Sequence, residues 1–305
     1  MKRAASSFFL GKVFTLFNGM TDGYLLKEFI NAVLEDREQD FWKIEMANKS
    51  FDSILNYIKS LGRDIKQFER VFDKNQGWFN GFALGTRIRK QEHLKLRVQF
   101  QERNLFGIKG KVNAQAVRVR VQPENPKSAQ LKGFIINIFF NAPPEVLTNP
   151  KVYNRWFAAN LEDILSNPSV KSSYVHEFTH VLDFKRMDPH FLLRRSMEKQ
   201  KQVDALKVSG GKRDFGKYAN DPLELNAYFS QAISDVRSML KQTQTEEEKQ
   251  KILGTTPQEF TDKFMQQYLK KQVRKNISPE NYQRLMKRAA TAWELLMREP
   301  IGQSV

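Results

Sequence analysis

The sequence predicts an α+β fold that is mainly helical with a small β-sheet. Three observations support this class. Apolar residues recur at helical spacing in the first third of the chain, alternate with charged residues in the middle, and return to helical spacing from residue 151 onward. Helices and strands that occupy separate runs are typical of α+β proteins rather than of alternating α/β folds.

Two helices are expected before the strands. Residues 24–37 and residues 51–72 both place apolar side chains on one helical face, and Gly62 could bend or divide the second run. Turn residues follow, and we expect a domain boundary between residues 80 and 90. The prediction is an N-terminal helical region, residues 1–85, and a second domain, residues 86–305, that ends in a C-terminal helical extension.

Three strands are expected in the middle of the chain. Residues 94–100 and 117–121 alternate apolar with charged or polar side chains, which is typical of half-buried strands. Residues 133–140 (GFIINIFF) are apolar enough to be buried on both faces. Beyond residue 150 we expect a Gly- and Lys-rich loop at residues 209–217 and helices at residues 152–165, 168–187, 191–206, 222–240, 257–270 and 279–297.

Composition restricts the chemistry. The chain of 305 residues has no cysteine, so disulfides, thiolate metal sites and a cysteine nucleophile are excluded. The net charge of +16 favours acidic proteins or nucleic acid as partners, although a lysine-rich solvated surface explains it equally well. The short apolar run after Met1 is interrupted by Lys12, and no segment is long enough for a membrane span. We therefore expect a soluble protein, either cytoplasmic or virion-associated.

The motif that carries chemistry is His176-Glu177-Phe178-Thr179-His180, an HExxH sequence within the helix expected at residues 168–187. Two histidines four residues apart on a helix point the same way and can bind one Zn²⁺. Glu177 beside them can take a proton from a zinc-activated water that attacks a carbonyl. By chance, HExxH occurs in about one chain of this length in a hundred. The alternative is a surface helix that happens to carry two histidines.

The third metal ligand has several candidates in the sequence. The residues after His180 lack the glycine and histidine of metzincins, and His190 could fold back only through a tight turn. Glu224, near the start of the helix at residues 222–240, is the favoured candidate, and Glu198 is a reserve. The alternative for Glu224 is a capping box with Asp221, which needs no metal.

Asp183 also has two interpretations. It lies on the same helical face as both histidines, so its carboxylate could accept the outer N–H of a ligand imidazole. Otherwise it is an ordinary solvated residue near the end of the helix.

The pair HEFTHVLD and NDPLELNAYF resembles the gluzincin metallopeptidases, in particular anthrax lethal factor-type catalytic domains and phage or prophage metallopeptidases. The resemblance covers residues 130 to 235 approximately. It implies a zincin-like domain with His176, His180 and Glu224 as zinc ligands and Glu177 as general base. It also implies that the strand at residues 133–140 offers its edge to an extended peptide, and that a tyrosine, Tyr218 or alternatively Tyr228, stabilises the oxyanion.

The leading hypothesis is therefore a zinc-dependent metallopeptidase that hydrolyses peptide bonds of a protein or peptide substrate; a toxin or effector acting on one host protein would share this chemistry. A basic structural or nucleic-acid-binding protein, such as a phage virion component with a structural or degenerate zinc site, is the alternative. Basic residues in the C-terminal third either bind phosphates or form a solvated helix face: Lys270, Lys271, Arg274, Lys275, Arg284, Lys287 and Arg288.

Overall fold

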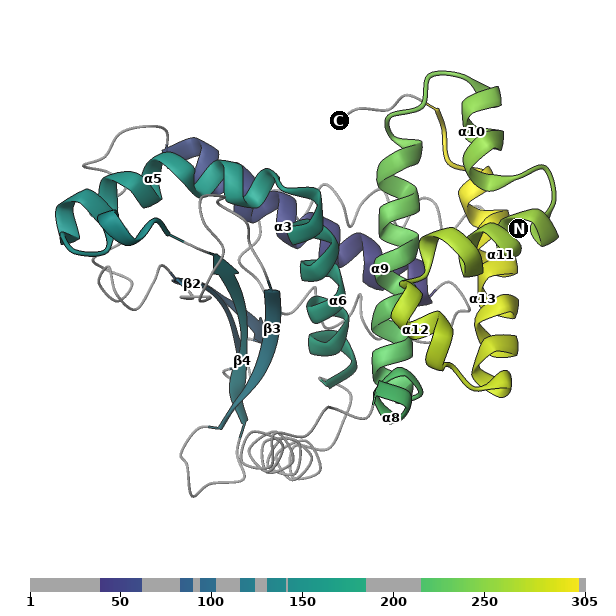
Figure 1. The fold of residues 1–305 in the computed structure, drawn as a ribbon, viewed down its shortest axis with the longest axis horizontal. Helices are drawn as coiled ribbons and strands as arrows, with labels where there is room; N and C mark the ends of the chain where they lie inside the picture. The colour runs from purple at the N-terminus through teal and green to yellow at the C-terminus, as the bar shows by residue number, and fades with distance from the viewer. Residues whose placement is uncertain are drawn as a thin grey trace.

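The computed structural model describes residues 39–61, 83–89, 94–102, 116–123, 131–140, 142–184 and 215–301. In these residues helices predominate and stand around and beside one small sheet (Figure 1). The expectation of a mainly helical chain is confirmed. None of the described helices combines the length and the hydropathy that crossing a bilayer requires.

The described sheet has four strands in the order β1-β2-β4-β3. They are β1 (Ala83–Arg89), β2 (Leu94–Glu102), β3 (Ala116–Pro123) and β4 (Leu131–Phe140). The three expected strands are confirmed as β2, β3 and β4. β4 runs parallel to β2 and antiparallel to β3, with Ile136 opposite both Val98 and Val119.

β4 is a central strand, because both of its edges are paired within the described sheet. Phe134, Ile136, Ile138 and Phe140, which share one face of the strand, are fully buried, and Asn137 on the opposite face is also buried, in keeping with the apolar sequence. The expectation that residues 133–140 offer a free edge to a peptide is therefore wrong. Among the described strands, the edges belong to β1 and β3.

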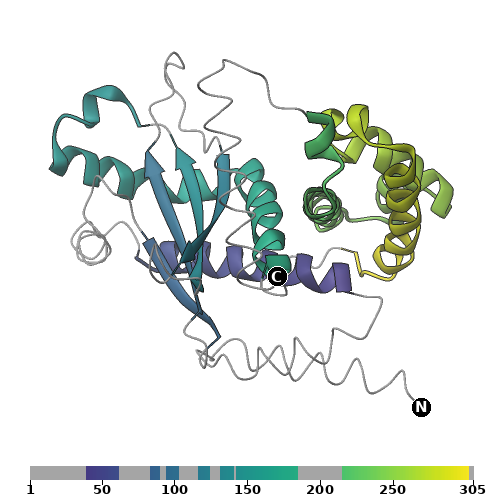
Figure 2. The same cartoon turned by 90° about the horizontal axis from the view of Figure 1, so that it is seen from below.

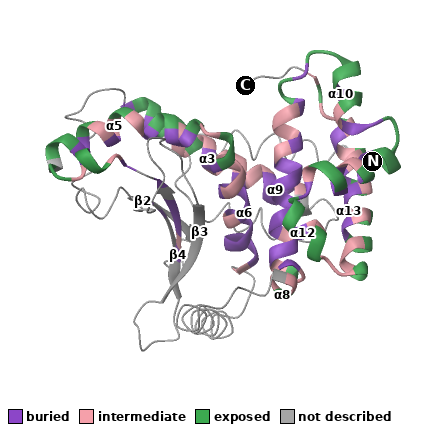
Figure 3. Cartoon of the chain, viewed as in Figure 1, coloured by how far each residue is buried: buried purple, intermediate pink, exposed green. Residues whose placement is uncertain are grey.

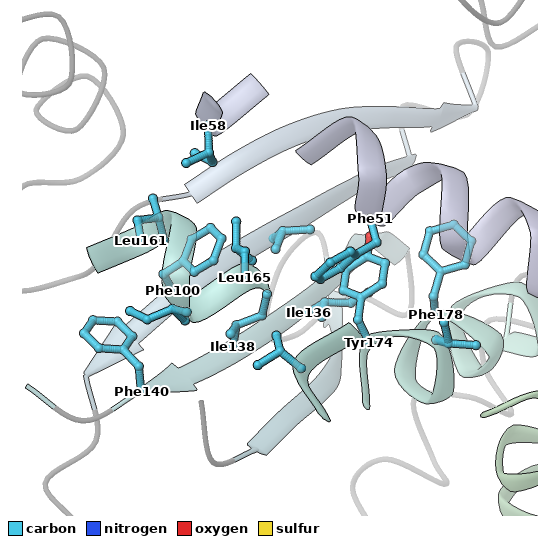
Figure 4. Packing of buried hydrophobic residues seen from close by; sticks show 14 of the residues in the cluster. Phe51, Ile58, Phe100, Ile136, Ile138, Phe140, Leu161, Leu165, Tyr174 and Phe178 are labelled. Atoms are coloured by element: carbon cyan, nitrogen blue, oxygen red, sulfur yellow. The ribbon is translucent and has the colours of Figure 1, made fainter. Parts of the chain in front are cut away.

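Three helices pack with the sheet around a first apolar core: α3 (Gln39–Leu61), α5 (Pro150–Ser166) and α6 (Pro168–Phe184). Figure 4 shows aromatic and aliphatic side chains of this core, contributed by the sheet and by all three helices. Phe140 of β4 stacks on Phe157 of α5 at 5.0 Å, and Phe51 of α3 lies 5.2 Å from Tyr174 of α6. These contacts fix α6 against the sheet.

The remaining helices build a second apolar core on the other side of α6 (Figures 1 and 2). α9 runs next to α6, and both helices are buried along most of their facing sides (Figure 3). The elements of this half are α8 (Phe215–Ala219), α9 (Pro222–Leu240), α10 (Glu246–Leu253), α11 (Pro257–Lys263), the π-helical turn η2 (Phe264–Tyr268), α12 (Lys271–Asn276) and α13 (Pro279–Met297).

Several elements differ from expectation. α3 begins at Gln39, twelve residues before the expected start, because buried Lys43 interrupts the apolar pattern that the prediction used. α10 and α12 were not expected, since each is short and polar, and the helix expected at residues 257–270 is α11 followed by η2. The loop expected at residues 209–217 gives way to α8 from Phe215.

β1 was not expected either, and the predicted division after residue 85 falls inside it; the division itself remains a prediction. Other expectations lie outside the described residues. These are the helix at residues 24–37, the helix at residues 191–206, residues 62–72 and 185–187 at the ends of two other expected helices, His190, and the reserve ligand Glu198.

Candidate metal centre

Three side chains converge between the two cores, two from α6 and one from α9. His176 and His180 lie one turn apart, and their rings are 4.9 Å apart, centroid to centroid. The Oε2 atom of Glu224 lies 3.4 Å from Nε2 of His176 and 3.3 Å from Nε2 of His180. All three residues are buried, and one ligand atom from each lies within 4.8 Å of the other two.

The local sequence explains how α9 presents Glu224. Asp221 caps the helix by accepting a hydrogen bond from the backbone N–H of Leu223, and Pro222 occupies the first turn, where its missing N–H costs nothing. The backbone N–H of Asp221 donates to the carbonyl of Tyr218. In a capping box this N–H group would instead donate to the Glu224 side chain. The Glu224 carboxylate is directed at the two imidazoles.

The spacing of these atoms suits a small tetrahedral cation. Ligand bonds of roughly 2.0–2.1 Å at tetrahedral angles place neighbouring ligand atoms about 3.3 Å apart. The two distances from Glu224 to the histidines match that separation. Burial is the main cause that lowers the pKa of His176 to about 4, so its imidazole is neutral at pH 7, the form that binds metals. The donor set is thus suited to Zn²⁺.

Glu177 follows the first histidine on α6. Its side chain is only half-buried, whereas those of both histidines are buried. Glu177 is therefore partly exposed to solvent. The expected general base thus lies beside the three convergent side chains.

Two tyrosines border the cluster. The ring of Tyr228 packs edge-on against His176 at 4.5 Å, and its hydroxyl donates to that of Tyr218 at 3.4 Å. Burial first, and then the Glu224 carboxylate, raise the pKa of Tyr218 far above its usual value. The Tyr218 hydroxyl therefore stays protonated and can act as a hydrogen-bond donor. Tyr218 is half-buried and Tyr228 is buried, so Tyr218 is the more accessible of the two.

Asp183 is engaged in a network that joins several helices. Its two oxygens accept from Nζ of Lys43 at 2.7 Å and from Nδ2 of Asn226 at 2.6 Å. The interpretation of a solvated Asp183 is therefore wrong, since the residue is buried. The Nδ1 atom of His176 has no hydrogen-bond partner among the described residues, so Asp183 does not orient that imidazole directly.

Comparison with protein-family models, with curated proteins and with solved structures found no match for this chain. The likeness to gluzincins therefore rests on the residues of the chain itself.

Sequence reasoning missed two lysines near the cluster. Lys43 lies on α3, far from the motif in sequence. Its neighbours in the sequence do not distinguish it from a surface lysine. Lys270 was counted only as part of a basic segment, yet its ammonium group lies 5.3 Å from the ring centroid of Tyr228. Only the fold, which brings Lys43 to α6 and Lys270 to α9, reveals either contact.

Proposed function

We propose that the chain is a zincin-like, zinc-dependent metallopeptidase that hydrolyses peptide bonds. The observation that carries the proposal is the convergence of His176, His180 and Glu224 in a buried cluster, with Oε2 of Glu224 3.4 and 3.3 Å from the two Nε2 atoms. An HExxH helix and a glutamate from a second helix form the ligand set of zinc peptidases with two histidines and one glutamate. These three side chains would hold the metal.

Zinc in such a site supplies Lewis acidity toward a carbonyl and lowers the pKa of a water molecule. The chain's own residues handle the protons and the developing charge. The Glu177 carboxylate takes a proton from the attacking water and returns it to the departing nitrogen. The Tyr218 hydroxyl, kept protonated by burial and by Glu224, donates a hydrogen bond to the oxygen that becomes negative.

The edge strand β3 supports the same proposal. Its antiparallel partner β4 occupies one side, and α6 packs close to the β3–β4 pair. Figure 1 shows β3 between β4 and the motif helix. An extended peptide could add to a free β3 edge through backbone hydrogen bonds, the common mode of β-strand addition.

The test has two parts. Zinc content is measured on wild type, His180→Ala and Glu224→Ala purified in parallel. We expect near-stoichiometric zinc in wild type, loss in His180→Ala and strong weakening in Glu224→Ala. Cleavage of an unfolded protein mixture is then followed by mass spectrometry with wild type and Glu177→Gln.

We expect new peptide termini with wild type only, while Glu177→Gln retains its zinc. Folded wild type that takes up no zinc when supplied with it would overturn the proposal. Zinc binding without cleavage in either protein would favour the alternative, a basic structural or nucleic-acid-binding protein with a structural zinc site.

A further inference from the structure

The backbone around Lys270 is fixed on both sides. The π-helical turn η2 precedes it, and Phe264 of that turn packs on Phe229 of α9 at 5.4 Å between ring centroids. Leu269 is buried, and its N–H donates to the carbonyl of Phe264 at 2.8 Å. The carbonyl of Lys270 itself accepts from Arg274 in α12. π-Helical turns occur frequently at functional sites, and this one delivers a single lysine toward α9.

The ammonium group of Lys270 lies beside the candidate metal centre. It stands 5.3 Å from the ring centroid of Tyr228, and the same ring lies 4.5 Å from that of His176. Lys270 and His176 thus contact the same tyrosine ring, which places the cation near the candidate metal centre.

No close carboxylate neutralises this cation within the described part of the chain. The carboxylates of Asp235 and Glu177 act on this cation electrostatically, but Lys270 forms no ion pair with another described residue. Asp235 instead accepts a hydrogen bond from Ser172 at 2.9 Å. Lys270 is exposed over the residue as a whole, so an incoming anion can reach its ammonium group. A cation that no carboxylate pairs attracts such an anion.

We propose that Lys270 forms a carboxylate-binding subsite next to the metal centre, which selects peptides that carry a carboxylate near the bond to be cleaved. The inference rests on the proposed function and names its substrate class. A monoanion fits better than a phosphate, because a dianion would meet two carboxylates, Glu177 and Asp235, close by. The carboxylate comes either from an Asp or Glu side chain or from a free peptide C-terminus.

The experiment measures binding separately from cleavage. Zinc-supplied, full-length Glu177→Gln is incubated with three octapeptide pools of neutral random sequence, and retained peptides are counted by ultrafiltration and mass spectrometry. One pool has a fixed central Glu and an amidated end, the second has Gln and an amidated end, and the third has Gln and a free C-terminus. The same pools are tested on the additional Lys270→Met, Lys270→Arg and Lys271→Met variants.

We expect at least one of the two acidic pools to bind about tenfold better than the neutral pool, and the pool that gains identifies the source of the carboxylate. Lys270→Met should remove this preference without changing binding of the neutral pool. Lys270→Arg should keep most of it, and Lys271→Met, which alters the neighbouring exposed lysine, should keep all of it. Equal retention of the three pools, including no retention of any, would overturn the proposal.

The outcome is separable from that of the proposed function. A Lys270-dependent preference in a chain whose wild type cleaves nothing would support the subsite and contradict the peptidase. Cleavage by wild type, with a preference that survives in Lys270→Met, would support the peptidase and contradict the subsite.

Discussion

The Nζ atom of Lys43 lies 2.7 Å from Oδ1 of Asp183, and the side chains of both are at least nine-tenths buried. The second oxygen of Asp183 accepts a hydrogen bond from the side-chain amide of Asn226. The Oδ1 atom of the same amide accepts one from the Arg288 guanidinium. These bonds connect α3, α6, α9 and α13. Asp183 is three residues beyond His180 and Asn226 is two beyond Glu224, so the network fixes the two helices that carry the candidate ligands.

The first prediction concerns the buried ion pair. Lys43→Met should destabilise the fold by about 3 to 5 kcal/mol, because it leaves the Asp183 carboxylate buried without its cation. Adding Asp183→Asn should recover part of the loss, since the amide oxygen still accepts from Asn226 and the charge is gone. Urea unfolding followed by circular dichroism measures both.

Lys59→Met is the matched control. Lys59 faces Glu162 at 3.9 Å, with half of each side chain exposed. Pairs of this kind contribute little, so the change should stay within about 0.5 kcal/mol. Equal losses for Lys43→Met and Lys59→Met would show that the buried pair is not what holds the helices.

Where the sequence pattern is local, the prediction succeeded. α9 and α13 begin and end as expected, because Pro222 and Pro279 mark their first turns and the apolar spacing is regular. The central position of β4 could be inferred only in part. Its apolar run predicted burial on both faces, but strand pairing depends on contacts between distant segments.

In the candidate site, too, the residues in a local pattern were predicted and those brought together from distant segments were not. The HExxH spacing identified two members of the cluster from five consecutive residues. Glu224 was ambiguous because a capping box and a ligand require the same residue at the same helical position. Lys43 and Lys270 are separated from the motif by more than eighty residues, and no local pattern encodes either contact.

A second prediction uses metal removal. If the cluster binds zinc, a chelator should lower the midpoint of thermal unfolding of wild type by about 5 °C, because a ligand at 100 times its Kd stabilises by about 2.7 kcal/mol. Glu177→Gln should show the same decrease, since it keeps all three ligands. His176→Ala should show almost none. A decrease of equal size in His176→Ala would place the bound metal elsewhere.

A third prediction separates the two tyrosines. Tyr218→Phe should lower kcat by about 100-fold with little change in KM and zinc content, because it removes one donor to the developing oxyanion. Tyr228→Phe should lower kcat less than tenfold, since its ring still packs on His176 and its hydroxyl is directed at Tyr218. Steady-state kinetics on a substrate identified by mass spectrometry measures both. The reverse order of effects would assign the oxyanion contact to Tyr228.

The last prediction concerns pH and stability. Burial raises the pKa of Asp235 from 3.8 to about 6, although Ser172 donates to its carboxylate and Lys270 lies nearby. Because its pKa is higher in the fold than in the unfolded chain, Asp235 stabilises the fold at pH values below the unfolded pKa. This contribution is lost as the pH rises through about 6. The ionised carboxylate is thus the unfavourable form in the fold.

Asp235→Asn removes that ionisation and keeps an oxygen that accepts from Ser172. The variant should be close to wild type near pH 4, where the Asp235 carboxyl of the folded protein is protonated, and should be more stable by about 1 to 2 kcal/mol at pH 8. Urea unfolding at both pH values measures the difference, and exposed Glu162→Gln, within about 0.5 kcal/mol of wild type at each, is the control. A variant less stable than wild type at pH 8 would mean that attraction between the Asp235 carboxylate and Lys270 outweighs the cost of burying the charge.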